Sequence, residues 1–521
     1  MRIMLLNPPT KFKVSKDSRW PEFTKSGTLY YPFWLGYATV VLKEHGKHTP
    51  MLVDAIAKDM DFSQTLEIMQ KFHPDLLVID TSTSTIYRDV AFVDEAKKTF
   101  PEMRTIFTGR HPTALPDQTF VMSKNIDFIA RQEYDYTILD LANTLDAGGD
   151  LKNVLGLSWR NNGSVVHNDP RPLPEDLDKI PFVSKAYKEF LNVWDYRYAL
   201  ARYPMIQIWT SRGCPARCVY CDYPQVFTMH GYRTRSAKNV VDEMEWIQKN
   251  LPDVKEIFFE DDTFTIDIPR AHAICDEIVS RGMKLIWSCN VRANVPEETL
   301  RKMKEAGCRI LIVGYESGNQ GVLNKMKKGI ILKQAEEFTR AAQKHGLKIF
   351  GCFMLGLPGD NRETIEDTFQ FAKKMHPDMV FFQQAVPFPG TEFFQWLKMN
   401  GYMRTNDFSK WLDDNGRLDV LYDYPGISGD DMASLRDKMM LRYYLDPKHI
   451  FYTLTRNMHP HEFIRVVRYA TDYLLYLFNR KMLERKLGGA KTQTGGLKPV
   501  QFPVQLQPEI EVPVEALVKS T

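Results

Sequence analysis

The feature that most constrains this chain is a group of three cysteines, Cys214, Cys218 and Cys221, in the spacing C-x3-C-x2-C. An apolar, β-leaning run over residues 205–209 precedes the group and stops at Gly213. Three thiolates on one short loop can ligate three irons of a [4Fe–4S] cube and leave the fourth iron open for a small ligand. The spacing therefore predicts an iron–sulfur cluster bound by the loop after this strand.

Two simpler interpretations of the cysteines are a zinc site and buried thiols. Structural zinc takes a fourth Cys or His at ligand spacing, and only His230 lies near the loop. If the cysteines were only buried thiols, nothing would require three of them within eight residues after a glycine turn. The cluster is the interpretation that the spacing favours.

At this loop the sequence resembles the radical S-adenosylmethionine (SAM) superfamily, whose hallmark is C-x3-C-x-(aromatic)-C. The resemblance implies that Cys214, Cys218 and Cys221 ligate the cluster and that SAM chelates its open iron. Tyr220 stands in the aromatic position and would lie near the adenine of SAM. One electron would cleave SAM to methionine and a 5′-deoxyadenosyl radical, which removes a hydrogen atom from the substrate. The protein would position this radical and exclude water.

Composition limits the compartment and the partners. The 521 residues allow three or so domains, and 44% hydrophobic and 26% charged residues are ordinary for a soluble globular protein. A net charge of +3 gives no argument for nucleic-acid binding. The first apolar run is broken too early for a signal peptide, and no run approaches the length of a membrane span. Seven cysteines, three of them clustered, do not indicate a disulfide framework, so we expect a cytoplasmic protein.

Residues 1–147 alternate short apolar strands with helices. The expected strands are 2–6, 51–54, 76–80, 105–107 and 126–130, and the expected helices are 34–44, 63–72, 91–100 and 137–145. The strand at 76–80 is apolar on both faces, as in a sheet covered by helices on both sides. The pattern predicts an α/β fold, a doubly wound, Rossmann-like parallel sheet with a ligand crevice at the strand ends.

This domain resembles the cobalamin-binding domain that precedes many radical SAM modules. The resemblance rests on the stretches 7–9, 109–116 and 131–133. It implies that cobalamin is bound by four residues, Asn7, Gly109, His111 and Glu133.

Two departures from the family pattern concern this cobalamin site. The family usually reads RGEGE where this chain has Gln132 and Tyr134 in place of the two glycines. The Asp-x-His-x-x-Gly motif that supplies a histidine to cobalt in other proteins is absent, so cobalamin would be bound without that ligand. The alternative is a flavodoxin-like domain whose pocket is empty or reused.

Residues 148–195 are expected to form a β-hairpin on the Asn162-Gly163 turn, followed by a proline-rich linker. Residues 196–400 alternate again. The expected strands are 205–209, 256–259, 285–289, 309–313, 348–354 and 379–383, separated by helices at 240–249, 270–281, 297–306, 334–345 and 362–375. This pattern predicts a partial (β/α)6 radical SAM barrel, with its chemistry at the residues that follow each strand.

The resemblance assigns roles to those residues. The triplet Glu260, Asp261 and Asp262 stands where the family's second strand meets the methionine ammonium of SAM. Arg292 and Glu316 stand where side chains meet the methionine carboxylate and the ribose, and the stretch from Gly356 to Gly359 passes close to the adenine. A lone charge is more often part of a surface ion pair. Four polar clusters that each close an apolar strand favour the functional interpretation.

Residues 401–488 are expected to form a helical C-terminal region, and residues 489–521 a disordered tail. Within this region, residues 463–487 are consistent with one long helix rich in aromatic and basic side chains. Such a helix can lie in a membrane interface with its cations on the headgroups, or it can pack on its own protein. The first alternative would place the protein peripherally at the inner face of the membrane.

Within the superfamily, the sequence looks most similar to hopanoid-biosynthesis radical SAM proteins with a cobalamin domain. The similarity is carried by residues 130–137, 232–236, 261–264, 313–318 and 355–359 and covers about residues 1–400. It implies that the hexosamine ring of glucosaminyl-bacteriohopanetetrol is contracted to a cyclopentane cyclitol ether. The C-terminal region, where substrate choice can reside, departs from this family.

Two other functions stay open. A cobalamin-dependent radical methylase would pass a methyl group from methylcobalamin to the substrate radical and form S-adenosylhomocysteine beside 5′-deoxyadenosine. A non-catalytic iron–sulfur or cobalamin sensor is the third hypothesis, and the polar strand ends argue against it because a sensor needs no SAM-binding barrel. For either enzyme we expect a small-molecule or lipid-linked sugar substrate, an external electron donor such as ferredoxin or flavodoxin, and no nucleic acid.

Overall fold

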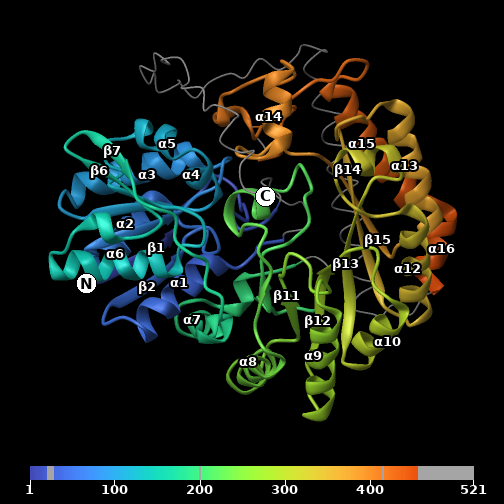
Figure 1. Ribbon diagram of the computed structural model, residues 1–521, viewed down its shortest axis with the longest axis horizontal. Coiled ribbons are helices and arrows are strands. Elements are labelled where there is room, and N and C mark those ends of the chain that lie inside the picture. The colour runs from blue at the N-terminus through green and yellow to red at the C-terminus, as the bar shows by residue number, and fades with distance from the viewer. Residues whose placement is uncertain (20–27, 199–200, 414–415, 456–521) are drawn as a thin grey trace. The chain divides into compact units, whose positions relative to one another are not determined.

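Two large sheets organise the computed structural model, which describes residues 1–19, 28–198, 201–413 and 416–455 (Figure 1). The first belongs to the N-terminal part of the chain and the second to the part that carries the cysteines. All described residues belong to one compact unit. No helix among them is both long and apolar enough to cross a membrane.

The N-terminal sheet has the strand order β2-β1-β3-β4-β5-β6-β7. Its strands are β1 (Arg2–Asn7), β2 (Thr49–Asp54), β3 (Leu76–Asp80), β4 (Arg104–Thr108), β5 (Phe128–Ala130), β6 (Leu157–Asn161) and β7 (Ser164–His167). The first five strands are parallel, and their order 2-1-3-4-5 is that of a doubly wound sheet whose switch point lies between β1 and β3. The predicted Rossmann-like fold is confirmed.

Six helices accompany this sheet: α1 (Phe33–Glu44), α2 (Phe62–Phe72), α3 (Ile86–Thr99), α4 (Arg110–Ala114), α5 (Pro116–Met122) and α6 (Asp135–Ala147). Asp61 starts α2 through a capping box with Gln64. Helix α1 packs against α6, while α2 contacts α3 through the rings of Phe62 and Phe92. The stretch 109–116, whose glycine and prolines indicate a loop, contains α4 and the start of α5.

The predicted hairpin extends the N-terminal sheet. Strand β6 pairs antiparallel with β5, and β7 pairs antiparallel with β6. Asn162 and Gly163 both have positive φ, 49° and 88°, as a two-residue type I′ turn requires. The linker that follows contains two short 3-10 turns, η2 (Leu177–Lys179) and η3 (Val193–Asp195), and a helix that no sequence pattern indicates, α7 (Val183–Phe190). A third short turn, η1 (Leu151–Asn153), precedes the hairpin.

The second sheet has six parallel strands in the order β8-β11-β12-β13-β14-β15, which confirms the predicted partial barrel. Its strands are β8 (Met205–Ile208), β11 (Glu256–Phe259), β12 (Ile286–Val291), β13 (Cys308–Glu316), β14 (Lys348–Leu355) and β15 (Met379–Gln384). The helices between them are α8 (Ala237–Asn250), α9 (Ile268–Ser280), α10 (Glu297–Glu305), α11 (Gln320–Lys325), α12 (Leu332–Lys344) and α13 (Arg362–Met375). Because the strands are parallel, the residues after each strand meet at one edge of the sheet.

Strand β15 is an edge of this sheet, and a helix of the C-terminal region covers it. The described C-terminal elements are α14 (Glu392–Met399), η5 (Phe408–Lys410), α15 (Gly429–Tyr444) and α16 (Pro447–Thr455). The hydroxyl of Tyr444 accepts a hydrogen bond from the Val380 N–H over 3.0 Å and donates one to the Val380 carbonyl over 2.8 Å. The predicted helix at 463–487 and the predicted tail lie outside the described residues.

Candidate functional site

The three cysteines lie on the loop that follows β8 and the short strand β9 (Ser211–Arg212). Cys214 and Cys218 are buried, Cys221 is half-buried, and all three are free thiols. Gly213 has a φ of 85°, and a Cβ at this position would lie 1.9 Å from the carbonyl oxygen of Gly231. The turn that starts the loop therefore accepts glycine and no larger residue.

The three thiols suit a cluster better than a single ion. Within residues 1–19, 28–198, 201–413 and 416–455, no three His, Cys, Asp or Glu side chains converge on one metal-ion site. Structural zinc needs four ligands around one ion, whereas the thiolates of a [4Fe–4S] cluster bind different irons. The amide of Gln225 donates to the carbonyls of Cys218 and Cys221, each over 2.9 Å, and so holds the loop in shape. Three free thiols on one fixed loop fit the cluster.

The acidic triplet after β11 divides into one carboxylate with a structural role and two others. Asp261 accepts hydrogen bonds from the Thr210 N–H and from the Ser211 hydroxyl, both over 2.6 Å. Both of its oxygens are therefore used to fix the strand end that leads into the cysteine loop. Glu260 Oε2 accepts a hydrogen bond from the Gln207 amide over 3.0 Å, and the Thr228 hydroxyl lies 3.5 Å from Asp262 Oδ2. Neither carboxylate is bonded to Thr210 or Ser211, so these two are the candidates to receive an ammonium group.

Glu260 and Asp262 share one cation, Arg19, which no predicted site includes. The Nη1 atom of Arg19 lies 2.9 Å from Glu260 Oε1, and its Nη2 atom lies 2.6 Å from Asp262 Oδ1. Burial raises the pKa of Glu260 to about 7, although Arg19 opposes this shift. Arg19 lies in a loop with no recognisable motif and 241 residues before Glu260, so no local pattern indicates the contact.

A second polar cluster joins the cysteine loop to the end of β13. The Tyr220 hydroxyl donates to Glu316 Oε1 over 2.9 Å, and Lys328 Nζ lies 2.7 Å from the same oxygen. Arg292 donates to the carbonyl of Lys328, so the residue expected near the methionine carboxylate is adjacent to this cluster. Three of the predicted residues thus meet here, together with Lys328, which the sequence analysis does not single out.

The stretch Gly356–Gly359 forms the turn after β14. Both glycines have positive φ, 81° and 96°. The Asp360 carboxylate accepts from the N–H groups of Gly356 and Leu357 over 2.9 and 3.0 Å, and burial raises its pKa to about 6. A Cβ at Gly356 would lie 2.5 Å from the Tyr422 hydroxyl, so the chain here is packed on its outer side by the C-terminal region.

Two of the four residues expected to bind cobalamin are engaged within the protein. Asn7 donates to Asp54 Oδ1 over 2.9 Å. Glu133 is paired with Arg212, over 3.0 Å, and with Arg233. The resemblance gives no sign of these ion pairs, because the two arginines come from the barrel part of the chain.

The other two residues, Gly109 and His111, lie in the turn after β4. Gly109 has a φ of 104°, and a Cβ there would lie 2.4 Å from the Thr81 carbonyl oxygen. His111 is buried, and its Nδ1 lies 3.2 Å from the Thr83 hydroxyl, while its Nε2 is buried without a hydrogen-bond partner. Burial lowers the pKa of His111 to about 3, so the ring is neutral at physiological pH.

A cavity of about 210 Å³ adjoins this turn. It is lined by Thr113, Ala114, Arg131, Gln132, Gly156, Pro170, Gln225, Val226, Met229 and Gly390. Small-molecule sites span roughly 300–1,000 Å³, so the cavity as it stands is too small for a corrin ring. Polar groups of the cobalamin-like motifs reach it, but the space for the whole cofactor is not formed in this structure.

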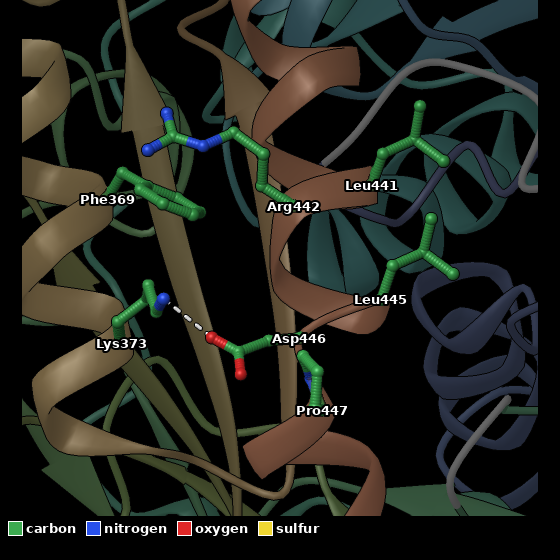
Figure 2. Close-up of a pocket in the computed structure, with 7 residues that line it drawn as sticks. All are labelled: Phe369, Lys373, Leu441, Arg442, Leu445, Asp446 and Pro447. Atoms are coloured by element: carbon green, nitrogen blue, oxygen red, sulfur yellow. Dashed lines mark ion pairs between the residues drawn. The ribbon is translucent and has the colours of Figure 1, made fainter.

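A second cavity, of about 550 Å³, lies between α13 and α15 (Figure 2). Lys373 Nζ is paired with Asp446 over 2.6 Å, and the Arg442 guanidinium lies 3.9 Å from the ring centroid of Phe369. None of the predicted site residues lines this cavity. It is therefore separate from the polar strand ends.

Known proteins resemble this chain in sequence over most of its length. The family description "Radical SAM superfamily" matches residues 209–372, which run from the cysteine loop into α13. An uncharacterized methyltransferase of Pyrococcus horikoshii is 32% identical over 449 residues, or 86% of this chain and 93% of that protein. An anaerobic magnesium-protoporphyrin IX monomethyl ester cyclase of Rubrivivax gelatinosus is 27% identical over 390 residues, or 73% of this chain and 68% of that protein.

A solved structure shares the fold across both sheets. It is the radical S-adenosylmethionine methyltransferase TsrM of Kitasatospora setae with cobalamin and a [4Fe–4S] cluster bound. The likeness covers 86% of this chain and 89% of that one, with a TM-score of 0.64 and 18% sequence identity. At this identity the likeness concerns the fold alone.

Proposed function

The chain belongs to the radical SAM superfamily, and on that premise we propose that it is a cobalamin-dependent radical SAM methyltransferase that acts on a small molecule. As a radical SAM enzyme it uses a [4Fe–4S] cluster and SAM. The proposal of methyl transfer rests on the 32% identity to a protein named a methyltransferase. The match covers 93% of that protein's length.

Residues at different strand ends would bind the cluster and the different parts of SAM. Cys214, Cys218 and Cys221 would ligate the cluster. When bound, cluster and SAM together supply the 5′-deoxyadenosyl radical that removes a hydrogen atom from the substrate. Glu260 and Asp262 would receive the methionine ammonium of SAM, since the oxygens of Asp261 are committed to Thr210 and Ser211.

The remaining strand ends would bind the other parts of SAM. Arg292 and Lys328 offer positive charge for the methionine carboxylate, and they are adjacent because Arg292 donates to the Lys328 carbonyl. Tyr220 and Glu316, joined by their hydrogen bond, would face the ribose and the adenine. In the Gly356–Gly359 turn the two glycines have no side chain, and their backbone would lie against the adenine.

Cobalamin would bind at the carboxyl ends of the N-terminal strands, next to the switch point between β1 and β3. When bound, it would supply the methyl group for the substrate radical. The fold shared with a cobalamin-bound methyltransferase supports the proposal that cobalamin binds. The cavity of about 210 Å³ is lined in part by residues that follow β4 and β5, and it is too small to hold the ring by itself.

The prediction of hopanoid ring contraction stays untested. Hopanoid chemistry appears in the name of none of the relatives reported above, and one of them is named for a cyclisation instead. Methyl transfer is therefore the better supported chemistry. The predicted membrane contact depends on residues 463–487, which lie outside the described residues.

One experiment tests the proposal without knowledge of the substrate. Anaerobically reconstituted protein is reduced and incubated with hydroxocobalamin and with SAM that carries a deuterated methyl group, and the products are followed by mass spectrometry. A cobalamin-dependent methyltransferase forms S-adenosylhomocysteine from the half-reaction with cobalamin, in addition to 5′-deoxyadenosine. The Cys214→Ala/Cys218→Ala/Cys221→Ala variant should form no 5′-deoxyadenosine.

Two outcomes would contradict it. If 5′-deoxyadenosine forms without S-adenosylhomocysteine, the enzyme carries out a rearrangement or a cyclisation. If the protein fails to bind hydroxocobalamin at micromolar concentrations, the N-terminal domain is a scaffold only.

A further inference from the structure

The side chain of Arg19 reaches from the N-terminal part of the chain to the end of β11. Its two terminal nitrogens contact Glu260 over 2.9 Å and Asp262 over 2.6 Å. The two carboxylates are 2% and 4% exposed, and Arg19 is 27% exposed. A guanidinium is planar and donates in fixed directions, so one arginine sets the orientation of both carboxylates.

The backbone that carries Arg19 is fixed by buried contacts. Lys16 pairs with Asp89 over 2.7 Å, and both side chains are at most 2% exposed. Arg110 donates to the carbonyl oxygens of Lys16 and Ser18 over 2.9 and 2.6 Å. The arginine side chain therefore starts from a defined point and not from a loose loop.

Tyr223 ties the same loop to the cysteine loop. It follows Cys221 by two residues, and its hydroxyl donates to the carbonyl of Asp17 over 2.6 Å. The guanidinium carbon of Arg19 lies 4.8 Å from the centroid of the Tyr223 ring, a cation–π distance. Arg19 is thus held in place by the loop that is expected to carry the cluster as well as by the two carboxylates.

The charges suit one further cation. When Glu260 and Asp262 are both ionised, two carboxylates against one guanidinium leave one negative charge, which a primary ammonium would neutralise. Burial raises the pKa of Glu260 to about 7 even in the presence of Arg19. Without Arg19 a larger fraction of this carboxyl would be protonated at neutral pH and unable to attract a cation.

We infer that Arg19 is a positioning residue of the SAM site, which holds Glu260 and Asp262 in the orientation and charge state that receive the methionine ammonium. This inference rests on the proposed function, because it takes these two carboxylates as the ammonium acceptors. In the opposite role, the Arg19 guanidinium would occupy the place of the ammonium and compete with it. The fixed backbone at residues 16–18 and the contact with Tyr223 favour a permanent place for Arg19.

The test measures ligand binding by full-length, cluster-loaded protein under anaerobic conditions. Two ligands are compared by equilibrium titration: SAM, and 5′-methylthioadenosine, which has the nucleoside but no ammonium or carboxylate. Arg19→Ala should raise the Kd for SAM tenfold or more and change the Kd for 5′-methylthioadenosine less than twofold. Arg19→Lys keeps the charge but cannot bridge both carboxylates, so it should restore part of the affinity.

The matched control is Lys13→Ala, which removes a more exposed cation of the same segment, paired with Asp59 over 2.7 Å. It should leave both affinities unchanged. Tighter binding of SAM by Arg19→Ala would show that Arg19 competes with the ammonium. Equal weakening of both ligands would show a general structural role. Either result overturns the inference, and so does an unchanged affinity for SAM. If wild-type protein itself binds no SAM, the proposed function fails before Arg19 is tested.

Discussion

The hydroxyl of Tyr220 donates a hydrogen bond to Glu316 Oε1 over 2.9 Å, and this contact joins the cysteine loop to the end of β13. Glu316 has a φ of 65°, a backbone conformation that residues other than glycine rarely adopt. Such strain costs roughly 1–3 kcal/mol and persists where surrounding contacts hold the residue in place. Tyr220 and Lys328 supply those contacts here.

Lys328→Met should destabilise the protein because it leaves Glu316 buried without its cation. Lys328 and Glu316 are each 8% exposed and lie 2.7 Å apart. Breaking a buried pair on one side costs about 3–5 kcal/mol, and the double variant with Glu316→Gln should cost less than the single one. Chemical denaturation measures the free energy of unfolding of the single and the double variant.

The control for this pair is the neighbouring residue. Lys327 pairs with Glu392 at the surface, where the two side chains are 53% and 52% exposed. Lys327→Met should therefore change the free energy of unfolding by about 0.5 kcal/mol or less. Equal effects at 327 and 328 would contradict the assigned role of the buried pair.

The cysteine loop should account for all the bound iron. The triple alanine variant of Cys214, Cys218 and Cys221 should lose about four irons per chain after anaerobic reconstitution. Cys275→Ala, which removes a buried thiol on α9, should keep the iron content of the wild type. Iron retained by the triple variant would disprove the assignment.

The stability of the protein should fall as the pH rises through the titration of Asp360. Burial raises the pKa of Asp360 from 3.8 to about 6, so the native state binds its proton more tightly than the unfolded state does. The stabilisation is complete below about pH 4 and is lost as the pH rises to about 6, a change of about 2–3 kcal/mol. Asp360→Asn cannot titrate and should flatten this part of the profile.

Urea denaturation of both proteins between pH 4 and pH 7 gives the comparison. The difference between wild type and Asp360→Asn should change over this range and be constant above it. A difference that is independent of pH would show that Asp360 stays ionised in the native state. The hydrogen bonds that it accepts from Gly356 and Leu357 would then outweigh its burial.

Arg212→Met should cost about 3–5 kcal/mol, because it leaves the buried Asp135 without its cation and the buried Glu133 with Arg233 alone. Arg212 lies 3.0 Å from Glu133 and 2.7 Å from Asp135, and all three side chains are 2% exposed. Arg301→Met, at an exposed arginine paired within its own helix, is the control and should destabilise the protein far less. Similar losses would mean that the buried network contributes no more than a surface pair.

The elements that the sequence predicts well are those that a local pattern of residues indicates. The six barrel strands are apolar runs that end in polar residues, and the hairpin carries its Asn162-Gly163 turn. The cysteine loop follows from spacing alone. Helix α7 is missed because the prolines before it indicate a linker, and α4 and α5 are missed because Pro112 and Pro116 resemble loop residues, although proline is well accepted at the first turn of a helix.

The contacts that complete the site cannot be predicted in this way, because they join distant parts of the chain. Arg19 meets carboxylates 241 and 243 residues away, and Lys328 meets Tyr220 across 108 residues. Glu133 illustrates the converse. Its motif suggests a ligand, but in the structure it pairs with Arg212 and Arg233, which only the packing of the two sheets brings to it.

The hydrogen bonds of Tyr444 with Val380 have a consequence for self-association. The outer edge of a sheet normally exposes N–H and C=O groups that can pair with a strand of another molecule and start aggregation. At Val380 one phenol hydroxyl satisfies both groups, so a foreign strand finds neither donor nor acceptor there. The six-stranded sheet thus ends in a strand whose pairing groups at Val380 are used by α15, so an approaching molecule would have to displace this helix before it could extend the sheet there.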